Sequence, residues 1–247
     1  LAVADLHLDQ AGRHLFFNSH RSIDGQEGER VWVASRADRG WTDVRPVPGA
    51  LNQDHLHWQV SVDSAGNLYF GTERAGGRGR DDIFVTSPFD PEQVGVCSAV
   101  PGRVNTRDHE STPYVSPQGD FLIFSRTPAD DGYGGADLYI SYRETDGSWG
   151  ISRNLGPTVN AEESECCPIV SPDGRFLFFL RIARGYKQVH WVSSEVFSRM
   201  RVDRIPDLVR EEHTEVDARY RRFSGLRSSM KKASTQRIPS SRSSWTS

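Results

Sequence analysis

Residues 165–179, ECCPIVSPDGRFLFF, contain the pattern that decides the fold. A short apolar run meets a Ser-Pro-Asp-Gly turn, and a second apolar run follows the turn directly. Proline presets φ in such a turn, and glycine supplies the positive φ that reverses the chain. The stretch therefore predicts two short antiparallel strands joined by a tight turn.

The same pattern recurs along the chain with a nearly constant period. Three stretches align without a gap: residues 52–66 (NQDHLHWQVSVDSAG), 105–119 (NTRDHESTPYVSPQG) and 160–174 (NAEESECCPIVSPDG). The turn glycines Gly12, Gly66, Gly119 and Gly174 are separated by 54, 53 and 55 residues. A shared period with shared offsets indicates that one structural unit has been duplicated.

Each period predicts β-strands and no helix. A first, inner strand is expected just before each turn, as at residues 113–116. A second strand follows the turn, at residues 14–18, 68–71, 121–125 and 176–180. The third strand is expected at residues 31–35, 83–86, 138–142 and 189–192. A fourth strand is expected to carry Trp41 or Trp149, with both indoles packed between units or, as the alternative, forming a platform on which a ligand stacks. Four strands per unit are typical of a propeller blade.

Further motifs carry a family resemblance. Residues 134–141 (GGADLYIS) and 148–160 (SWGISRNLGPTVN), together with residues 165–179, resemble the WD40-like, TolB-type (PD40) β-propeller repeat. The resemblance covers residues 1 to about 195 and is weaker in the first unit, where Asp9-Gln-Ala-Gly12 replaces Ser-Pro-Asp-Gly. Relatives are typically exported bacterial proteins, so the resemblance implies a periplasmic or extracellular location. It implies little about function, because one fold supports many activities.

We therefore expect an all-β chain with a β-propeller over residues 1–195. Its blades are expected at about residues 1–52, 53–105, 106–160 and 161–195, each with four strands except the last, which lacks its outer strand. Propellers usually complete one blade with strands from both termini, so the missing outer strand of the last blade is expected to come from upstream of Leu1. We therefore expect this chain to be the C-terminal part of a ring of about five blades. Residues 196–217 are expected to form a short helical or irregular extension, and the Ser/Arg-rich residues 218–247 a disordered basic tail.

Charge and hydropathy exclude two classes of partner. Residues 1–217 carry all 33 acidic residues but only 22 of the 30 basic ones, and such an acidic body repels phosphate backbones. No run of eighteen apolar residues occurs, so no membrane span is expected. We expect a monomer that binds a protein, peptide or glycan ligand and no nucleic acid.

Polar residues just before the inner strands are the candidate binding site. In the alignment His57, Glu110 and Glu165 share one position, and His55, Asp108 and Glu163 share another. If these side chains surround the mouth of a central channel, they form a negative site for an amine, a sugar or a cation. The alternative is that they cap backbone N–H groups between blades. No cofactor is expected, although a divalent cation could bind to carboxylates at this position.

Enzyme motifs are missing from the sequence. It contains no Gly-x-Ser-x-Gly elbow, and Ser61-Val-Asp63 does not continue into a sialidase-type Asp box. We therefore favour a non-catalytic binding or scaffold propeller. The alternative is a carbohydrate-active hydrolase or lyase that uses Glu110 and Glu165 as its paired carboxylates.

Other polar and sulfur-containing residues are assigned to structure. Asn52, Asn105 and Asn160 are expected in turns with left-handed backbone. Asp82 and Asp137 open the third strands and either cap their loops or add carboxylates to the mouth. Cys97, Cys166 and Cys167 allow no disulfide framework, so the adjacent pair is expected to pack as small apolar groups, with a strained redox pair as the alternative.

Overall fold

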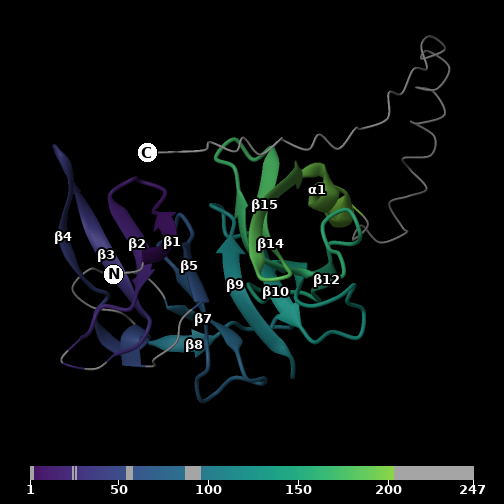
Figure 1. Cartoon of the computed structure of the whole chain (residues 1–247), viewed down its shortest axis with the longest axis horizontal. Coiled ribbons are helices and arrows are strands. Elements are labelled where there is room, and N and C mark those ends of the chain that lie inside the picture. The colour runs from purple at the N-terminus through teal and green to yellow at the C-terminus, as the bar shows by residue number, and fades with distance from the viewer. Residues whose placement is uncertain (1–2, 24, 26, 54–57, 87–95, 203–247) are drawn as a thin grey trace, which may run out of the picture. The chain divides into compact units, whose positions relative to one another are not determined.

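Four antiparallel sheets make up most of the structure. The computed structural model describes residues 3–23, 25, 27–53, 58–86 and 96–202. The sheets succeed one another in chain order as the blades of a propeller (Figure 1). The all-β propeller prediction is therefore confirmed.

Strands within each sheet are neighbours in sequence. Sheet 1 contains β1 (Val3–Leu8), β2 (His14–Ser19), β3 (Arg30–Ala37) and β4 (Gly40–Pro46), and a 3₁₀ turn, η1 (Gly49–Gln53), follows it. Sheet 2 contains β5 (Trp58–Val62), β6 (Leu68–Thr72), β7 (Asp82–Thr86) and β8 (Cys97–Ala99). Sheet 3 contains β9 (His109–Val115), β10 (Phe121–Thr127), β11 (Asp137–Tyr142) and β12 (Arg153–Asn154). Sheet 4 contains β13 (Ser164–Val170), β14 (Phe176–Ala183) and β15 (Tyr186–Ser193), and helix α1 (Glu195–Val202) follows.

The tight turns form where the repeat predicts them. Gly119 and Gly174 have φ values of 67° and 72°, a region that favours glycine because it has no Cβ. Each glycine donates its N–H to the carbonyl of the serine three residues earlier, at 2.8 Å in both turns. The turns thereby fix the register of the first two strands of their sheets.

The core lies between consecutive sheets. Alternation along the second strand sends one residue towards the following sheet and its neighbour towards the preceding one. Phe16, Tyr69 and Ile123 belong to the clusters shared with the following sheet. The residues that meet them from the next sheet are Leu68, Leu122 and Leu177.

A β-bulge interrupts every inner strand at the same place. The residues there have left-handed backbone, with φ of 53° at Asp5, 28° at Gln59, 47° at Thr112 and 54° at Cys167. The strand register shifts at each of these positions. The bulge is therefore part of the repeated unit, although the four residue types differ.

Side chains at the bulges connect each sheet to its successor. The Asp5 carboxylate accepts a backbone hydrogen bond from Gln59, and the Gln59 amide donates to the Pro113 carbonyl at 3.3 Å and to the Pro168 carbonyl at 3.0 Å. Thr112 Oγ1 accepts from the Cys167 N–H at 3.2 Å. Gln59 thus links the inner strands of sheets 2, 3 and 4 through one buried side chain.

The two tryptophans expected in fourth strands differ from each other. Trp149 lies outside β12, is buried, and packs edge-on against Tyr69 at 6.1 Å, so packing between sheets is confirmed for it. Trp41 lies in β4 but is 39% exposed under the Arg36 guanidinium, so the packing prediction is wrong there.

The last sheet is incomplete, as expected. The described residues supply three strands to sheet 4 and four to each other sheet. Helix α1 packs on sheet 3 instead, where Phe197 joins the core and its carbonyl accepts from the Tyr142 hydroxyl. The expected extension beyond α1 and the basic tail at 218–247 lie outside the described residues.

Candidate functional site

The predicted site residues lie at the beginnings of the inner strands. Glu110 and Glu165 are the second residues of β9 and β13, and Asp108 and Glu163 come directly before these strands. His55 and His57 lie outside the described residues. The alignment thus placed four of the six residues at equivalent points of two successive sheets.

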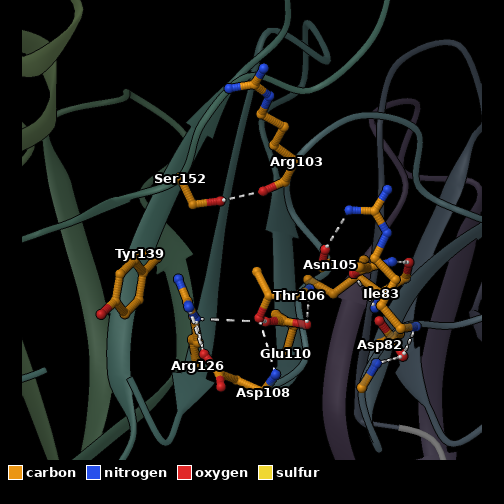
Figure 2. Close-up of polar contacts among 12 residues, drawn as sticks. Asp82, Ile83, Arg103, Asn105, Thr106, Asp108, Glu110, Arg126, Tyr139 and Ser152 are labelled. Carbon is orange, nitrogen blue, oxygen red and sulfur yellow. Dashed lines mark hydrogen bonds and ion pairs between the residues drawn. The ribbon is translucent and has the colours of Figure 1, made fainter. Parts of the chain in front are cut away.

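Glu110 is fully buried and bonded to its own loop. Its carboxylate accepts from the Thr106 N–H at 3.0 Å and from the Thr106 hydroxyl at 2.5 Å (Figure 2). The Arg126 guanidinium lies 3.7 Å away and binds Asp108 at 2.7 Å through Nε. Arg126 also stacks over the Tyr139 ring at 5.3 Å. Figure 2 shows the carboxylate enclosed between the loop and the arginine.

Glu165 repeats this arrangement one sheet later. Its carboxylate accepts from the Ala161 N–H at 3.1 Å and pairs with Arg181 Nε at 2.6 Å. Arg181 also donates to the Val159 carbonyl at 2.8 Å. Glu163 is half-buried, and among the described residues no hydrogen bond to its side chain is present.

Burial and neighbouring charges shift the pKa values of these two carboxyl groups. Burial raises the pKa of both Glu110 and Glu165, and the hydrogen bonds from Thr106 to Glu110 and from Arg181 to Glu165 only partly offset it. An arginine lies beside each glutamate, but Arg126 is shared between Glu110 and Asp108. The geometry is that of a loop cap within the sheet stack, and a ligand-binding role for these residues stays a prediction.

Three asparagines hold the loops that precede the inner strands. Asn105 Oδ1 accepts from the Ile83 N–H at 2.9 Å, and its Nδ2 donates to the Ile83 carbonyl at 2.8 Å. Asn52 and Asn160 make the same pair of bonds to Val31 and Leu138. The left-handed backbone expected at these asparagines is wrong: Asn52 has φ of −91°, and the described left-handed residues include none of the three. Each asparagine side chain instead binds the N–H and the carbonyl of one strand residue, as the backbone of a neighbouring strand would.

The aspartates at the third strands also serve their loops. One Asp82 carboxylate oxygen accepts from the backbone N–H groups of Arg78 and Gly79, at 2.9 and 3.0 Å. Asp137 accepts equivalently from the Tyr133 N–H at 2.6 Å. Both aspartates are buried, so the capping alternative describes them.

A hollow lined by arginines lies between sheets 2 and 3, and the sequence reasoning missed it. It has a volume of about 460 Å³ and is lined by Arg78, Arg103, Asn105, Thr106 and Arg107. All three arginines are exposed. The sequence does contain a signal of this hollow, because the equivalent positions in the next repeat hold Tyr133, Thr158 and Glu162 instead of arginine.

A second hollow lies between the inner strands of sheets 1 and 4. Its volume is about 330 Å³, and its lining includes His7, Gln59, Cys167 and Phe178. Burial lowers the pKa of His7, whose Nε2 accepts from the Val62 N–H at 3.1 Å. Cys167 reaches this hollow from the last bulge, with its sulfur 3.6 Å from that of Cys166 and no disulfide between them.

The described residues contain neither a metal-binding cluster nor a membrane-spanning helix. Within the described ranges, no group of three or more His, Cys, Asp or Glu side chains is positioned to hold a metal ion. No described helix has the length and apolar character needed to cross a membrane.

Comparison with known proteins identifies no family. No protein-family model matches the sequence, and no curated protein matches it. Among solved structures, a puromycin hydrolase S511A mutant aligns with 15% identity and a TM-score of 0.42, over 78% of this chain and 38% of the hydrolase. The NanB sialidase from Streptococcus pneumoniae aligns with 12% identity and a TM-score of 0.43, over 73% of this chain and 28% of the sialidase. The chain therefore spans well under half the length of either protein.

Proposed function

We propose that this protein is a non-catalytic binding propeller that engages a protein partner through sheet 4. The single observation that carries the proposal is an apolar sheet face that is buried in sheets 1, 2 and 3 and exposed in sheet 4 among the residues that the structure describes. We call the side of sheet 4 that carries Ile169, Phe178, Val189 and Trp191 the open face.

The repeat identifies what normally covers such a face. Phe178 occupies the position of Ile123 and Tyr69, which are 0% and 2% exposed under the following sheet, whereas Phe178 is 37% exposed. Val189 corresponds to Leu138 and is 70% exposed, although Leu138 is fully buried.

Trp191 adds a large aromatic side chain to the same surface. It is 61% exposed and packs edge-on against Phe176 at 5.3 Å. A contiguous exposed apolar surface of this kind typically marks an interaction site. The open face also continues into the hollow beside β1, where Ile169, Phe178 and Val189 are part of the lining.

The partner that fits is a protein presenting a β-sheet with an apolar face. In this molecule each such face is met by leucine and phenylalanine from a neighbouring antiparallel sheet, as at Leu122 and Phe124. Sheet packing of this kind is driven by apolar burial and needs side chains that interdigitate. Membership of the TolB-type repeat family and an exported location are further proposals, supported by the sequence resemblance alone.

The test places a photo-crosslinking residue at position 189 or, as the control, at position 151. Ile151 is 63% exposed but lies outside sheet 4, so it matches the apolar exposure of Val189. We expect a partner captured from position 189 alone. Once purified, this partner should bind the wild-type chain and Ile151→Asp equally, and bind Val189→Asp at least tenfold more weakly.

Two results would contradict the proposal. Equal capture from positions 189 and 151 would show that the open face is not a specific site. A concentration-dependent dimer that Val189→Asp abolishes, measured by sedimentation, would assign the face to a second copy of this chain.

A further inference from the structure

We propose that the arginine-lined hollow between sheets 2 and 3 is a binding site for a ligand that carries a phosphate or sulfate group. This site is separate from the open face of sheet 4, so it stands or falls independently of the proposed protein partner. The charge of the lining, the hydrogen bonds of the loops beneath it and the different residues in the next repeat support such a ligand.

The lining concentrates positive charge that no described acid neutralises. Arg78 comes from the β6–β7 loop, and Arg103 and Arg107 come from the β8–β9 connection. Among the described residues, no ion pair joins any of these three guanidinium groups to a carboxylate. The acids beside these loops have partners of their own, since Asp108 pairs with Arg126, Glu110 is bonded to Thr106, and Asp82 is bonded to the backbone N–H groups of Arg78 and Gly79. Like charges gathered around one hollow repel each other, and a bound anion relieves that repulsion.

The backbone under the arginines is held in place. Arg103 donates its N–H to the Trp149 carbonyl at 2.9 Å, and its own carbonyl accepts from the Ser152 hydroxyl at 3.3 Å (Figure 2). The Asn105 side chain fixes the middle of the loop to Ile83. Thr106, directly before Arg107, is fixed by Glu110. A loop that is already ordered loses little conformational entropy when a ligand binds.

Arg78 connects the two loops that form the hollow. Its backbone N–H is bonded to Asp82, and its guanidinium donates to the Asn105 carbonyl at 3.5 Å. This contact holds Arg78 against the loop that carries Arg103 and Arg107. Arginine forks bind the tetrahedral oxygens of phosphate and sulfate with paired, charge-assisted hydrogen bonds.

The repeat provides an internal control for the role of the arginines. The loop between sheets 3 and 4 keeps the structural residues, with Asn160, Asp137 and Glu165 bonded as Asn105, Asp82 and Glu110 are. The three arginines are replaced there by Tyr133, Thr158 and Glu162, and the same loop fold forms. The fold therefore does not require arginine at these positions, which points to a ligand.

Calorimetric titration with inorganic phosphate, and separately with sulfate, tests the site at constant ionic strength set with chloride. We expect one equivalent of anion to bind, and the Arg103→Ala/Arg107→Ala variant to bind at least tenfold more weakly. Arg39→Ala removes an exposed arginine from the β3–β4 turn of sheet 1 and should bind like the wild type. A preference between phosphate and sulfate would identify which ester the ligand carries.

A transplant gives a second, independent measurement. Tyr133→Arg/Thr158→Arg/Glu162→Arg places the same three side chains on the equivalent loops and should raise the stoichiometry from one anion to two. The circular dichroism spectrum and unfolding midpoint of every variant must match the wild type for its titration to count. The proposal is overturned if the wild type binds neither anion, if Arg39→Ala weakens binding as much as the double variant, or if a folded transplant gains no second site.

Discussion

The side chains of Asn52, Asn105 and Asn160, which we call the asparagine clamps, offer a direct test of how the sheets are joined. Replacing Asn105 by Ala removes a side chain that is 4% exposed and makes two hydrogen bonds to Ile83. The Ile83 carbonyl keeps a second partner, the Val100 N–H at 3.0 Å. The Ile83 N–H keeps none in the described structure and stays buried, so it becomes an unsatisfied donor.

The size of the effect follows from this asymmetry. An orphaned buried N–H costs about 1–3 kcal/mol, and the lost hydrogen bond to the carbonyl adds about 1 kcal/mol. We therefore expect Asn105→Ala to lower the free energy of unfolding by about 2–4 kcal/mol. For a folded unit of this size each kcal/mol shifts the melting temperature by about 2–4 °C, so the midpoint should fall by roughly 5–15 °C.

Urea unfolding followed by tryptophan fluorescence measures this loss. Gln118→Ala is the control, because it removes an exposed amide from the β9–β10 turn and should stay within about 0.5 kcal/mol of the wild type. Asn52→Ala and Asn160→Ala should lose amounts similar to Asn105→Ala, since their bonds are equivalent. An Asn105→Ala midpoint equal to that of Gln118→Ala would refute the clamp reasoning.

Three further predictions concern burial and pH. Arg181→Met leaves the buried Glu165 carboxylate without its cation and should lower the free energy of unfolding by about 3 kcal/mol at pH 7. Because burial already raises the pKa of Glu165, the loss should be smaller near pH 4.5, where the carboxylate becomes protonated. An equal loss at both pH values in urea titrations would contradict the pairing. Burial lowers the pKa of His7, so its contribution to stability is complete above pH 6.5 and is lost as the pH falls below it. His7→Gln keeps an acceptor for the Val62 N–H, and its melting temperature should depend less on pH between 7 and 5.5 than that of the wild type. An unchanged dependence would exclude His7 as its source. Gly134→Ala places a Cβ 2.2 Å from the Glu162 carbonyl oxygen, so thermal melting should show a loss of at least about 1–3 kcal/mol, and a wild-type midpoint would mean that the loop moves freely.

Period and turn chemistry made the fold predictable. The Ser-Pro-x-Gly turns and the recurring apolar pairs are local signals, and they identified the second and third strands of all four sheets. The bulges were not predictable, because Asp5, Gln59, Thr112 and Cys167 share a backbone conformation but no side-chain chemistry. Their left-handed backbone follows from strand pairing and not from residue preference.

The site was predicted by position but not by environment. Glu110 and Glu165 lie at equivalent places, as the alignment required, yet their arginine partners come from the next strand of the same sheet. Arg126 and Arg181 each follow their glutamate by sixteen residues, and this shared spacing is the signal of the pairing in the sequence. The arginine hollow depends on two loops 25 residues apart, at Arg78 and Arg103, which only the folded chain brings together.

The side-chain links at the bulges have a direction, and that direction has a consequence for assembly. Asp5, Gln59 and Thr112 each bind the backbone of an inner strand that comes later in the chain. Sheets built from consecutive strands can form with short loop closures, and a finished sheet then presents ready bonding groups to the one emerging after it. Folding can therefore advance from the first sheet to the last in the order of synthesis, with each sheet as the template for its successor. Under mechanical load the same order should run backwards, with sheet 4 detaching before sheet 3.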